Sequence, residues 1–440
     1  MAKKNPEPTI PPNERAFLVG VELRGTDNIL TLDESIAELG LLADTAGLDI
    51  VGQATQKLDS PYVQTFIGPG KIEEIKTLVS ESKADVLVFD NELSPRHLRE
   101  LEKEFGDEVR ILDRTALILD IFAQHAHTSE GALQVELAQY EYRLPRLTRA
   151  WTHLARQSGG GGGRAGSIGG VGLRGPGETQ LEVDRRDIRR RIAHLKNQIE
   201  KVRVHRQNYR VRRKQARIPV VALVGYTNAG KSTLLNRLSD ADIYVADQLF
   251  ATLDPTTRRV ELPGGHIALF TDTVGFIQKL PTTLVAAFRA TLEEISEADL
   301  LLHVVDITHP DAQAQAKIVH QTLVDIEADQ SPMLTVLNKI DRLGYPEMAR
   351  QVLHEYPNAV AISALTGEGI ADLLGKVNEQ LYESLLPIAV NLPYQEGALI
   401  AQFHELGQVD KIEHTQSGVK IYGRIPGRLL AYYRTFEAKK

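Results

Sequence analysis

The stretch "IPVVALVGYTNAGKSTLLNRL", residues 218–238, decides how the central part of the chain is expected to fold. The apolar run Val220–Val224 is typical of a buried strand, and the leucines near the end of the stretch favour a helix. Between them, Gly225–Ser232 has the spacing G-x4-G-K-S. A strand, a glycine loop of this spacing and a helix in that order predict a phosphate-binding P-loop.

The residue types of this loop match what a nucleotide phosphate requires. Glycines let successive backbone N–H groups curl around a β-phosphate, and the start of the following helix favours negative charge. Lys231 would neutralise β and γ oxygens, and Ser232 would offer its hydroxyl to Mg²⁺. The sequence therefore predicts a nucleotide site that uses Mg²⁺.

Three further motifs follow in order, each at the end of an apolar run. In "LFTDTVG", the carboxylate of Asp272 can reach Mg²⁺ through water, and the N–H of Gly275 can meet a γ-phosphate. In "TVLNKID", Asp341 can accept hydrogen bonds from N1 and N2 of guanine, whereas adenine has no matching donor pair. In "AISAL", a backbone N–H near Ser363 can contact guanine O6. The ordered set predicts an α/β GTPase domain with a mostly parallel sheet and helices on both faces.

Switch I should lie between Ser232 and Asp272. In "DQLFATLDPTTRR", the threonine hydroxyls that could serve as a second Mg²⁺ ligand belong to Thr252, Thr256 and Thr257, and spacing alone does not choose among them.

Position 276 departs from a common pattern. Many GTPases place glutamine directly after Asp-x-x-Gly to orient the attacking water, but this chain has Phe276. Phenylalanine forms no hydrogen bond to water, so we predict no catalytic side chain at this position and slow unaided hydrolysis.

Charge is unevenly distributed along the chain. The net charge is −7 over 440 residues. Residues 185–217 contain 14 Lys or Arg and 2 acids, a balance of +12, so the remainder carries −19. Like charges three or four positions apart repel on a helix, and phosphates would relieve that repulsion. We interpret the segment as a basic arm that binds RNA.

Apolar residues on both sides of a glycine tract share one helical pattern. Before the tract they recur at alternating spacings of four and three from Leu133 to Leu154, and after it from Ile188 to Val202. Residues 131–217 therefore predict an antiparallel helical hairpin, with a bend at Pro145. The tract 158–177 is either a flexible linker or the tip of this hairpin, and the helical stem favours a tip that approaches RNA.

The outer regions have their own patterns. After a flexible arm at 1–15, residues 16–130 predict an α/β domain, with strands at "AFLVGVEL", "DIVGQAT", "YVQTFIG" and "ADVLVFD". The G domain should cover 218–385 and a small α+β domain 386–440.

Composition narrows the class of protein. Hydrophobic residues make up 42% of the chain and cysteine is missing, which excludes disulfides and fits a reducing compartment. No apolar run approaches the roughly 20 residues that span a bilayer. We expect a cytoplasmic monomer without a membrane span.

The runs "GYTNAGKS", "FATLDPTTR", "DTVGF" and "GLRGPGETQLEVDRR", together with residues 112–139, resemble the HflX family of ribosome-associated GTPases. The resemblance implies a GTP hydrolase that binds the large ribosomal subunit and its rRNA, is activated by it, and splits or rescues stalled ribosomes under heat stress. It also implies that Thr252 is the switch I ligand of Mg²⁺ beside Ser232. The chain departs from the family in a longer glycine loop.

Motifs and resemblance together give the predicted site residues. For GTP these are Gly225, Tyr226, Thr227, Asn228, Ala229, Gly230, Lys231, Ser232, Phe250, Ala251, Thr252, Leu253, Asp254, Asp272, Thr273, Val274, Gly275, Asn338, Lys339, Ile340, Asp341, Ser363, Ala364 and Leu365. For RNA they are Arg164, Arg174, Arg185, Arg186, Arg189, Arg190 and Arg191.

The stretch "FIGPGKIEEI" resembles a phosphate loop but lacks its spacing, so an ordinary turn is the alternative. ATP binding has been proposed for the N-terminal domain of the family, and the residues implied here are Gly68, Gly70, Lys71 and Arg114.

The motifs leave three functions open. The first is a GTPase that dissociates or rescues ribosomes, the second a ribosome-assembly GTPase, and the third an RNA-docking protein with weak nucleotide coupling.

Overall fold

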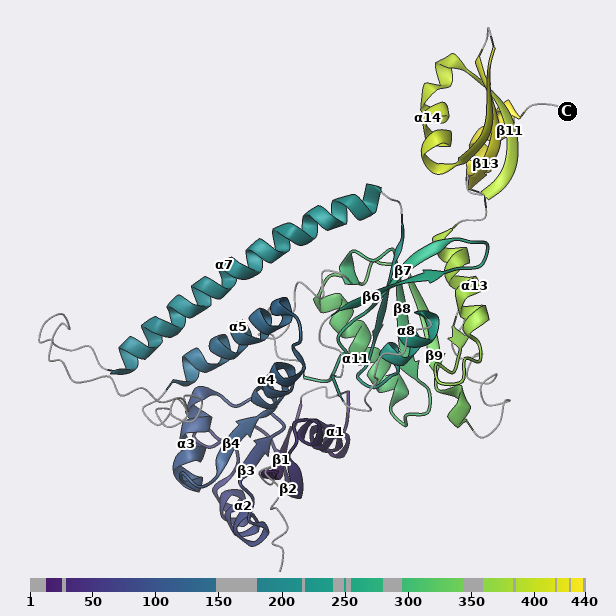
Figure 1. Cartoon of the computed structure of the whole chain (residues 1–440). Helices are drawn as coiled ribbons and strands as arrows, with labels where there is room; N and C mark the ends of the chain where they lie inside the picture. The colour runs from purple at the N-terminus through teal and green to yellow at the C-terminus, as the bar shows by residue number, and fades with distance from the viewer. Residues whose placement is uncertain are drawn as a thin grey trace, which may run out of the picture.

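The computed structural model of the chain (Figure 1) describes residues 13–25, 29–147, 180–215, 218–239, 249–250, 255–279, 295–343, 359–382, 385–415, 418–426 and 429–437. The strands of these residues form a parallel, a mixed and an antiparallel sheet, with helices between them. The α/β class predicted from the sequence is confirmed.

The first sheet is parallel, with the order β2-β1-β3-β4. Its inner strands read as apolar runs because helices cover both faces of a parallel sheet. The strands are β1 (Arg15–Leu23), β2 (Asp49–Leu58), β3 (Val86–Phe89) and β4 (Arg110–Asp113). The helices that follow them in turn are α1 (Leu32–Thr45), α2 (Pro69–Ser82), α3 (Pro95–Phe105) and α4 (Arg114–His125).

Side-chain caps fix where two of these helices begin. Thr31 and Glu34 form a capping box at α1, in which the Thr31 hydroxyl accepts from the Glu34 N–H and the Glu34 carboxylate accepts from the Thr31 N–H. At α4, the Asp113 carboxylate accepts from the N–H of Ala116 at 2.9 Å. Such caps stabilise a helix by about 1 kcal/mol each and set its register.

The predicted strand at "YVQTFIG" is wrong. Residues 62–68 form a turn closed by an isolated bridge, in which the backbones of Tyr62 and Phe66 exchange hydrogen bonds of 3.1 and 3.0 Å. Phe66 has a left-handed φ of 65°. The side chain of Val63 is 70% exposed, so its β-branched shape contributes nothing to a sheet.

Two helices follow the first sheet and lie side by side (Figure 1), α5 (Ser129–Arg146) and α7 (Gln180–Gln215). Leu195 of α7 is fully buried, as its place in the predicted apolar pattern requires. At Pro145, where we expected a bend, the helix ends one residue later. The glycine tract, with Arg164 and Arg174, lies outside the described residues.

The second sheet carries the P-loop, and its order is β10-β9-β8-β5-β7-β6. All neighbours are parallel except β6 and β7. The strands are β5 (Val220–Gly225), β6 (Thr256–Glu261), β7 (Ile267–Asp272), β8 (Leu300–Asp306), β9 (Met333–Asn338) and β10 (Val360–Ala361). The helices around it are α8 (Lys231–Ser239), α11 (Ala312–Asp325) and α13 (Ile370–Leu381).

The third sheet is antiparallel and packs against one longer helix. Its order is β11-β13-β12. Phe403 and Tyr433 meet edge to face in its core, with ring centroids 5.5 Å apart. The elements are β11 (Leu385–Pro393), α14 (Gly397–Leu406), β12 (Gln408–His414), β13 (Gly418–Pro426) and the short α15 (Leu430–Tyr433).

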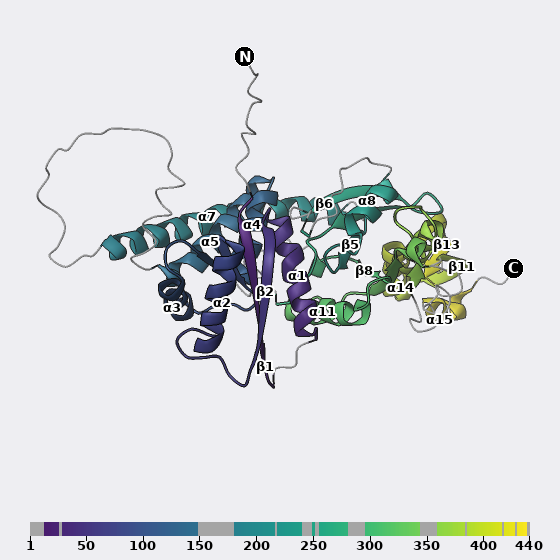
Figure 2. The same cartoon turned by 90° about the horizontal axis from the view of Figure 1, so that it is seen from below.

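The N-terminal and G domains share a continuous apolar core. It combines residues of α1 and α4 with Phe250, Val274, Phe276 and Ile277 of the G domain. Figure 2 shows the N-terminal and G domains side by side with helix α1 between their sheets, and the C-terminal sheet at the far side of the G domain. The segments next to the P-loop therefore pack directly on the N-terminal domain.

Candidate functional site

The P-loop has the backbone that its glycines predict. Gly225 has a φ of 157°, and a Cβ there would lie 2.3 Å from the carbonyl oxygen of Val304. Gly230 has a φ of 94°, and its Cβ would lie 2.3 Å from the amide nitrogen of Asn338. A side chain at Gly225 would press on the backbone of β8, and one at Gly230 would displace the amide of Asn338 at the end of β9.

Lys231 lies in the centre of the loop. Its ammonium donates to the carbonyl oxygens of Gly225 at 3.0 Å and Tyr226 at 2.8 Å. Burial lowers the pKa of Lys231 to about 8, against the opposing effect of the nearby Asp272 carboxylate. A phosphate oxygen is the natural partner for this buried cation.

The hydroxyl predicted to bind Mg²⁺ and the carboxylate predicted to reach Mg²⁺ through water are in contact. The hydroxyl of Ser232, at the start of α8, donates to the Asp272 carboxylate at the end of β7 over 2.6 Å. A hydroxyl and a carboxylate are oxygen ligands of the kind that Mg²⁺ prefers. Thr227 beside them has a buried hydroxyl oxygen with no hydrogen-bond partner among the described residues, which suits a ligand in the loop. The residues present fit a nucleotide with its metal ion.

The guanine motifs converge on the edge of the sheet where β9 and β10 end. Asn338 connects two loops, because its amide donates to the carbonyl of Ala229 at 2.9 Å and its side-chain oxygen accepts from the N–H of Ala364 at 3.0 Å. The Ser363 hydroxyl donates to one carboxylate oxygen of Asp341 at 2.6 Å. Asp341 is exposed and so is available to a purine base.

Lys339 and Leu365 frame the same edge. Lys339 has a left-handed φ of 68° and forms an ion pair of 2.7 Å with Asp306 at the end of β8. Leu365 is 65% exposed. An exposed apolar side chain two residues after Ser363, which bonds to Asp341, offers a surface for the flat face of a base.

Only part of switch I lies in the described residues. Phe250 is buried with a φ of 58°, and its ring meets Phe122 of α4 edge to face at 4.6 Å between centroids. Residues 251–254, with Thr252, lie outside the described residues. Thr256 and Thr257 are part of β6, and the hydroxyl of Thr257 forms a hydrogen bond with that of Thr271.

Residues 272–279, which we call switch II, lie across the P-loop. The N–H of Thr227 donates to the carbonyl of Phe276 at 2.8 Å, and the N–H of Phe276 donates to the carbonyl of Gly225 at 3.1 Å. The side chain of Phe276 is only 2% exposed and packs in the core shared with the N-terminal domain. At this position, therefore, the chain has a residue that packs rather than one that contacts water.

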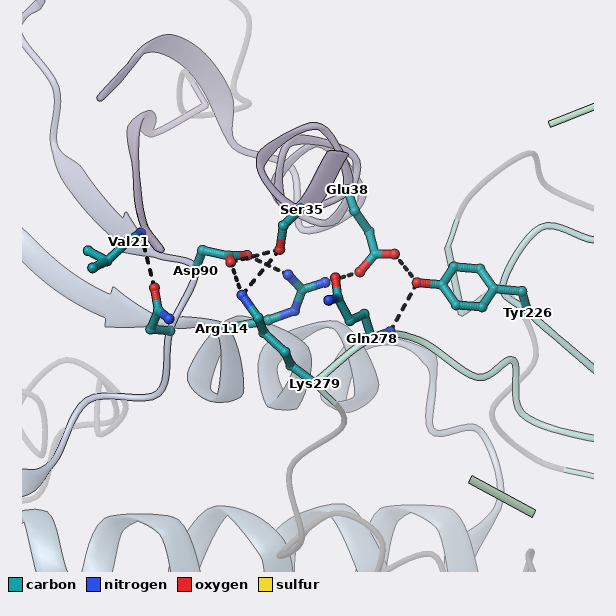
Figure 3. Close-up of polar contacts among 9 residues, drawn as sticks. Val21, Ser35, Glu38, Asp90, Arg114, Tyr226, Gln278 and Lys279 are labelled. Carbon is teal, nitrogen blue, oxygen red and sulfur yellow. Dashed lines mark hydrogen bonds and ion pairs between the residues drawn. The ribbon is translucent and has the colours of Figure 1, made fainter. Parts of the chain in front are cut away.

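Sequence reasoning missed a group of charged and polar side chains behind the P-loop (Figure 3). Glu38, Asp90 and Arg114 of the N-terminal domain meet Tyr226 and Lys279 of the G domain there. The one available signal was the tyrosine itself, because a large aromatic residue inside a P-loop must find space outside the phosphate site.

The residues implied for ATP binding are engaged with other protein groups. The N–H of Gly68 donates to the side chain of Gln56, and Lys71 pairs with Glu74 on the same helix. The guanidinium of Arg114 is buried and bonded to two carboxylates, so it does not face a ligand. Nothing in this arrangement supports ATP at the N-terminal domain, and we do not propose it.

Acidic side chains of α5 pair with some of the basic side chains of α7. The sequence of α7 alone does not show these partners. Arg191 forms hydrogen bonds of 2.7 to 2.9 Å with Glu136, and Lys196 pairs with Glu141 at 2.8 Å. Arg190 lies 3.4 Å from Asp187 on α7 itself. Arg189 is exposed and has no ion pair within the described residues. Arg185 and Arg186 lie on the preceding turn of the same helix.

None of the described helices is both long enough and apolar enough to cross a bilayer.

A P-loop, an Asp-x-x-Gly segment and the Asn-Lys-x-Asp and Ser-Ala motifs, all at strand ends of one mixed sheet, define the G domain as that of a P-loop GTPase. Family models match along the chain: "GTP-binding GTPase N-terminal" over 33–123, "GTP-binding GTPase Middle Region" over 125–213, "50S ribosome-binding GTPase" over 220–339 and "HflX C-terminal domain" over 348–426.

Two curated relatives agree with these models. "GTPase HflX" of Alkalihalophilus pseudofirmus is 44% identical over 429 residues, which cover 95% of this chain and 97% of the relative. "GTPase HflX" of Escherichia coli is 45% identical over 396 residues, with 89% and 90% covered. The chain belongs to the HflX family of GTPases.

A solved GTP-binding protein from Sulfolobus solfataricus, in complex with GDP, is 24% identical and covers 84% of this chain and 98% of its own. Its TM-score of 0.41 is too low to carry any argument about this structure.

Proposed function

We propose that the protein hydrolyses GTP with Mg²⁺, docks on the large ribosomal subunit and uses the nucleotide cycle to dissociate or rescue stalled ribosomes in the cytoplasm. The observation that carries the proposal is the convergence of Lys231, the Ser232–Asp272 pair and the Asp341–Ser363 pair on one edge of the sheet. A chain that only docked on RNA would have no need of a base-reading carboxylate held in place by a neighbouring hydroxyl.

Each of these residues would have a separate role in binding GTP. Lys231 binds β and γ oxygens, Asp341 orients the guanine, and Gly275 offers an N–H toward the γ-phosphate. Mg²⁺, when bound beside Ser232 and Thr252, would neutralise charge on the phosphate oxygens. Because Phe276 is buried and forms no hydrogen bond to water, the attacking water must be positioned by another group.

We infer that the ribosome supplies or orders that missing group. A partner that lowers the barrier by about 4 kcal/mol accelerates turnover roughly a thousandfold. The matching family model describes a 50S ribosome-binding GTPase, which supports the large subunit as this partner.

The test is GTP turnover by the full chain with and without purified large subunits. We expect slow turnover alone and a large stimulation by the subunits. Maximal turnover without any ribosomal component would contradict the proposal.

Sedimentation of intact ribosomes with added protein and GTP separates rescue from assembly. Conversion of whole ribosomes into subunits supports splitting. Unchanged ribosomes, with the protein bound only to immature large subunits, would favour an assembly GTPase instead.

A further inference from the structure

Behind the P-loop, the N-terminal and G domains meet at a buried cluster of four charges, which we call the interdomain charge cluster. Its members are Glu38, Asp90 and Arg114 from the N-terminal domain and Lys279 from switch II (Figure 3). The Asp90 side chain is 0% exposed, that of Arg114 2% and that of Lys279 30%. Two cations thus balance two carboxylates in a space with little water.

Hydrogen bonds connect every member of the cluster. The guanidinium of Arg114 donates to both Glu38 and Asp90. The ammonium of Lys279 donates to Asp90 and, at 3.2 Å, to the hydroxyl of Ser35, which itself donates to Asp90 at 2.8 Å. Burial lowers the pKa of Arg114 to about 10, which leaves it charged at neutral pH.

Tyr226 extends the cluster into the P-loop. Its hydroxyl donates to the carboxylate of Glu38 and accepts from the backbone N–H of Gln278 in switch II at 3.0 Å. Burial raises the pKa of Tyr226 to about 12, so the hydroxyl keeps its proton at neutral pH. One phenolic oxygen therefore connects the P-loop, switch II and helix α1 of the N-terminal domain.

These contacts hold switch II in a position that leaves little room for a γ-phosphate. A Cβ at Gly275 would lie 2.8 Å from the Cα of Thr227 and 3.1 Å from the ammonium nitrogen of Lys231. Lys231 itself donates to carbonyl groups of the loop. A γ-phosphate bound between Lys231 and the N–H of Gly275 requires these two residues to separate, whereas GDP has no γ-phosphate to place there.

Moving switch II away from the P-loop costs free energy, because it separates the Lys279 ammonium from the buried Asp90 carboxylate. Lys279 lies four positions after Gly275, so a movement of the whole of switch II away from the P-loop also draws Lys279 from Asp90. If Lys279 leaves, the two buried carboxylates share the single cation Arg114, and an uncompensated charge remains in a region of low dielectric constant. GTP binding is opposed by this cost, and GDP binding is not.

We propose that the interdomain charge cluster is a latch that holds switch II on the P-loop and lowers the affinity for GTP relative to GDP. Tyr226 and Lys279 are its positioning residues on the G domain, and Glu38 and Asp90 its anchors on the N-terminal domain. The inference rests on GTP binding at the P-loop but not on any role at the ribosome. Through the latch, the N-terminal domain acts on nucleotide choice without contacting nucleotide.

The experiment measures the dissociation constants of GDP and of a non-hydrolysable GTP analogue for the full chain with Mg²⁺. For Lys279→Met we expect the affinity for the analogue to rise about tenfold relative to GDP, with the GDP constant changed less than twofold. Lys279→Arg keeps the charge and should restore the original ratio. The matched control is Lys76→Met, which removes a lysine that pairs with Glu73 and Glu104 on the surface of the N-terminal domain.

Tyr226→Phe is the second variant, because it keeps the buried ring and removes only the hydroxyl. It should raise the relative affinity for the analogue in the same direction even if Lys279→Met proves unstable. Hydrogen exchange of the Gln278 amide gives an independent readout. It should be slow without nucleotide and with GDP, and faster with the analogue.

An unchanged affinity ratio in both folded variants, or equal protection of the Gln278 amide with GDP and with the analogue, would overturn the latch. If the unaltered protein binds neither nucleotide, the proposed GTPase function fails instead. The GDP measurement therefore separates the two failures.

Discussion

Burial of Lys231 lowers its pKa before any ligand binds. Its ammonium is held by two backbone carbonyls and has a pKa lowered to about 8, because burial disfavours the charged form. Phosphate oxygens would favour that form and raise the pKa again. Binding of a nucleotide is therefore coupled to the protonation of Lys231 just above neutral pH.

We expect the affinity for GDP to be constant between pH 7 and the pKa of about 8, and to fall as the pH rises further. The sign follows because the free protein loses the proton first, and the complex must take it up again. Isothermal titration in buffers of different ionisation enthalpy measures this proton uptake. The residual binding of Lys231→Met should show no such pH dependence, and a flat profile in the unaltered protein would contradict the assignment.

The residues of the site were predictable from sequence where local backbone geometry determines them. Gly225 and Gly230 have left-handed backbones, and a Cβ would strike the backbone of β8 at Gly225 and the amide of Asn338 at Gly230. The role of the Tyr226 hydroxyl could not be predicted, because its acceptor Glu38 is 188 positions away in the chain. Arg114 was assigned to an ATP site from the family resemblance, and the sequence did not show that its guanidinium is buried and bonded to Glu38 and Asp90.

At the scale of elements, helix α7 receives its counter-charges from α5. Composition alone showed a basic segment almost without acids, but Glu136 and Glu141 belong to a helix that ends more than thirty residues earlier. Exposed ion pairs of this kind contribute about 0 to 1 kcal/mol to stability. Their larger effect is on the field that the helix presents to RNA.

Two single changes on this helix pair should shift docking on the large subunit in opposite directions. Arg189→Ala removes a cation that has no ion pair within the described residues, and should weaken docking, with the salt slope reduced by about 0.7 to 0.9. Glu136→Gln releases Arg191 from its carboxylate and should strengthen docking. Glu73→Gln on α2 is the control for an acid elsewhere.

The affinity of each variant for the large subunit, measured across a range of salt concentrations, tests whether the basic face of α7 contacts phosphates. If both variants change the affinity in the same direction, the basic face of α7 does not contact phosphates, and the RNA role that we give to this helix is wrong.

Helices were predicted well where apolar residues recurred over many turns. A strand was predicted wrongly where only the types of residue in a short segment suggested it. The spacing of apolar residues located α5 and α7, but the aromatic and β-branched residues of 62–68 suggested a strand that does not exist. In that segment Phe66 adopts a left-handed backbone and the chain turns back on itself. Pairing with a neighbouring strand depends on tertiary structure, which composition does not contain.

At the scale of the whole molecule, the N-terminal and G domains share one core and the C-terminal domain has its own. Phe250 and Phe276 of the G domain pack among residues of α1 and α4, whereas the core of the last domain draws only on residues from Ile388 onward. The first two domains are therefore expected to unfold together.

GDP should stabilise the N-terminal domain as well as the domain that binds it. At a hundred times its dissociation constant, GDP adds about 2.7 kcal/mol, which raises the unfolding temperature of a unit of about 300 residues or more by about 3 to 5 °C. Calorimetry gives the shift, and hydrogen exchange near the midpoint shows where it acts. Slower exchange confined to the G domain, with α4 unaffected, would contradict a shared core.

Helix α7 has a mechanical consequence. It contains 36 residues, which at 1.5 Å per residue make a rod of about 54 Å. The rod ends at Gln215, five positions before the strand that leads into the phosphate loop. A rotation of α5 and α7 together by about one degree about that base would sweep the opposite end through roughly 1 Å. Movements too small to disturb the nucleotide pocket would then become atomic-scale displacements at a distance, and the helix pair would act as a lever.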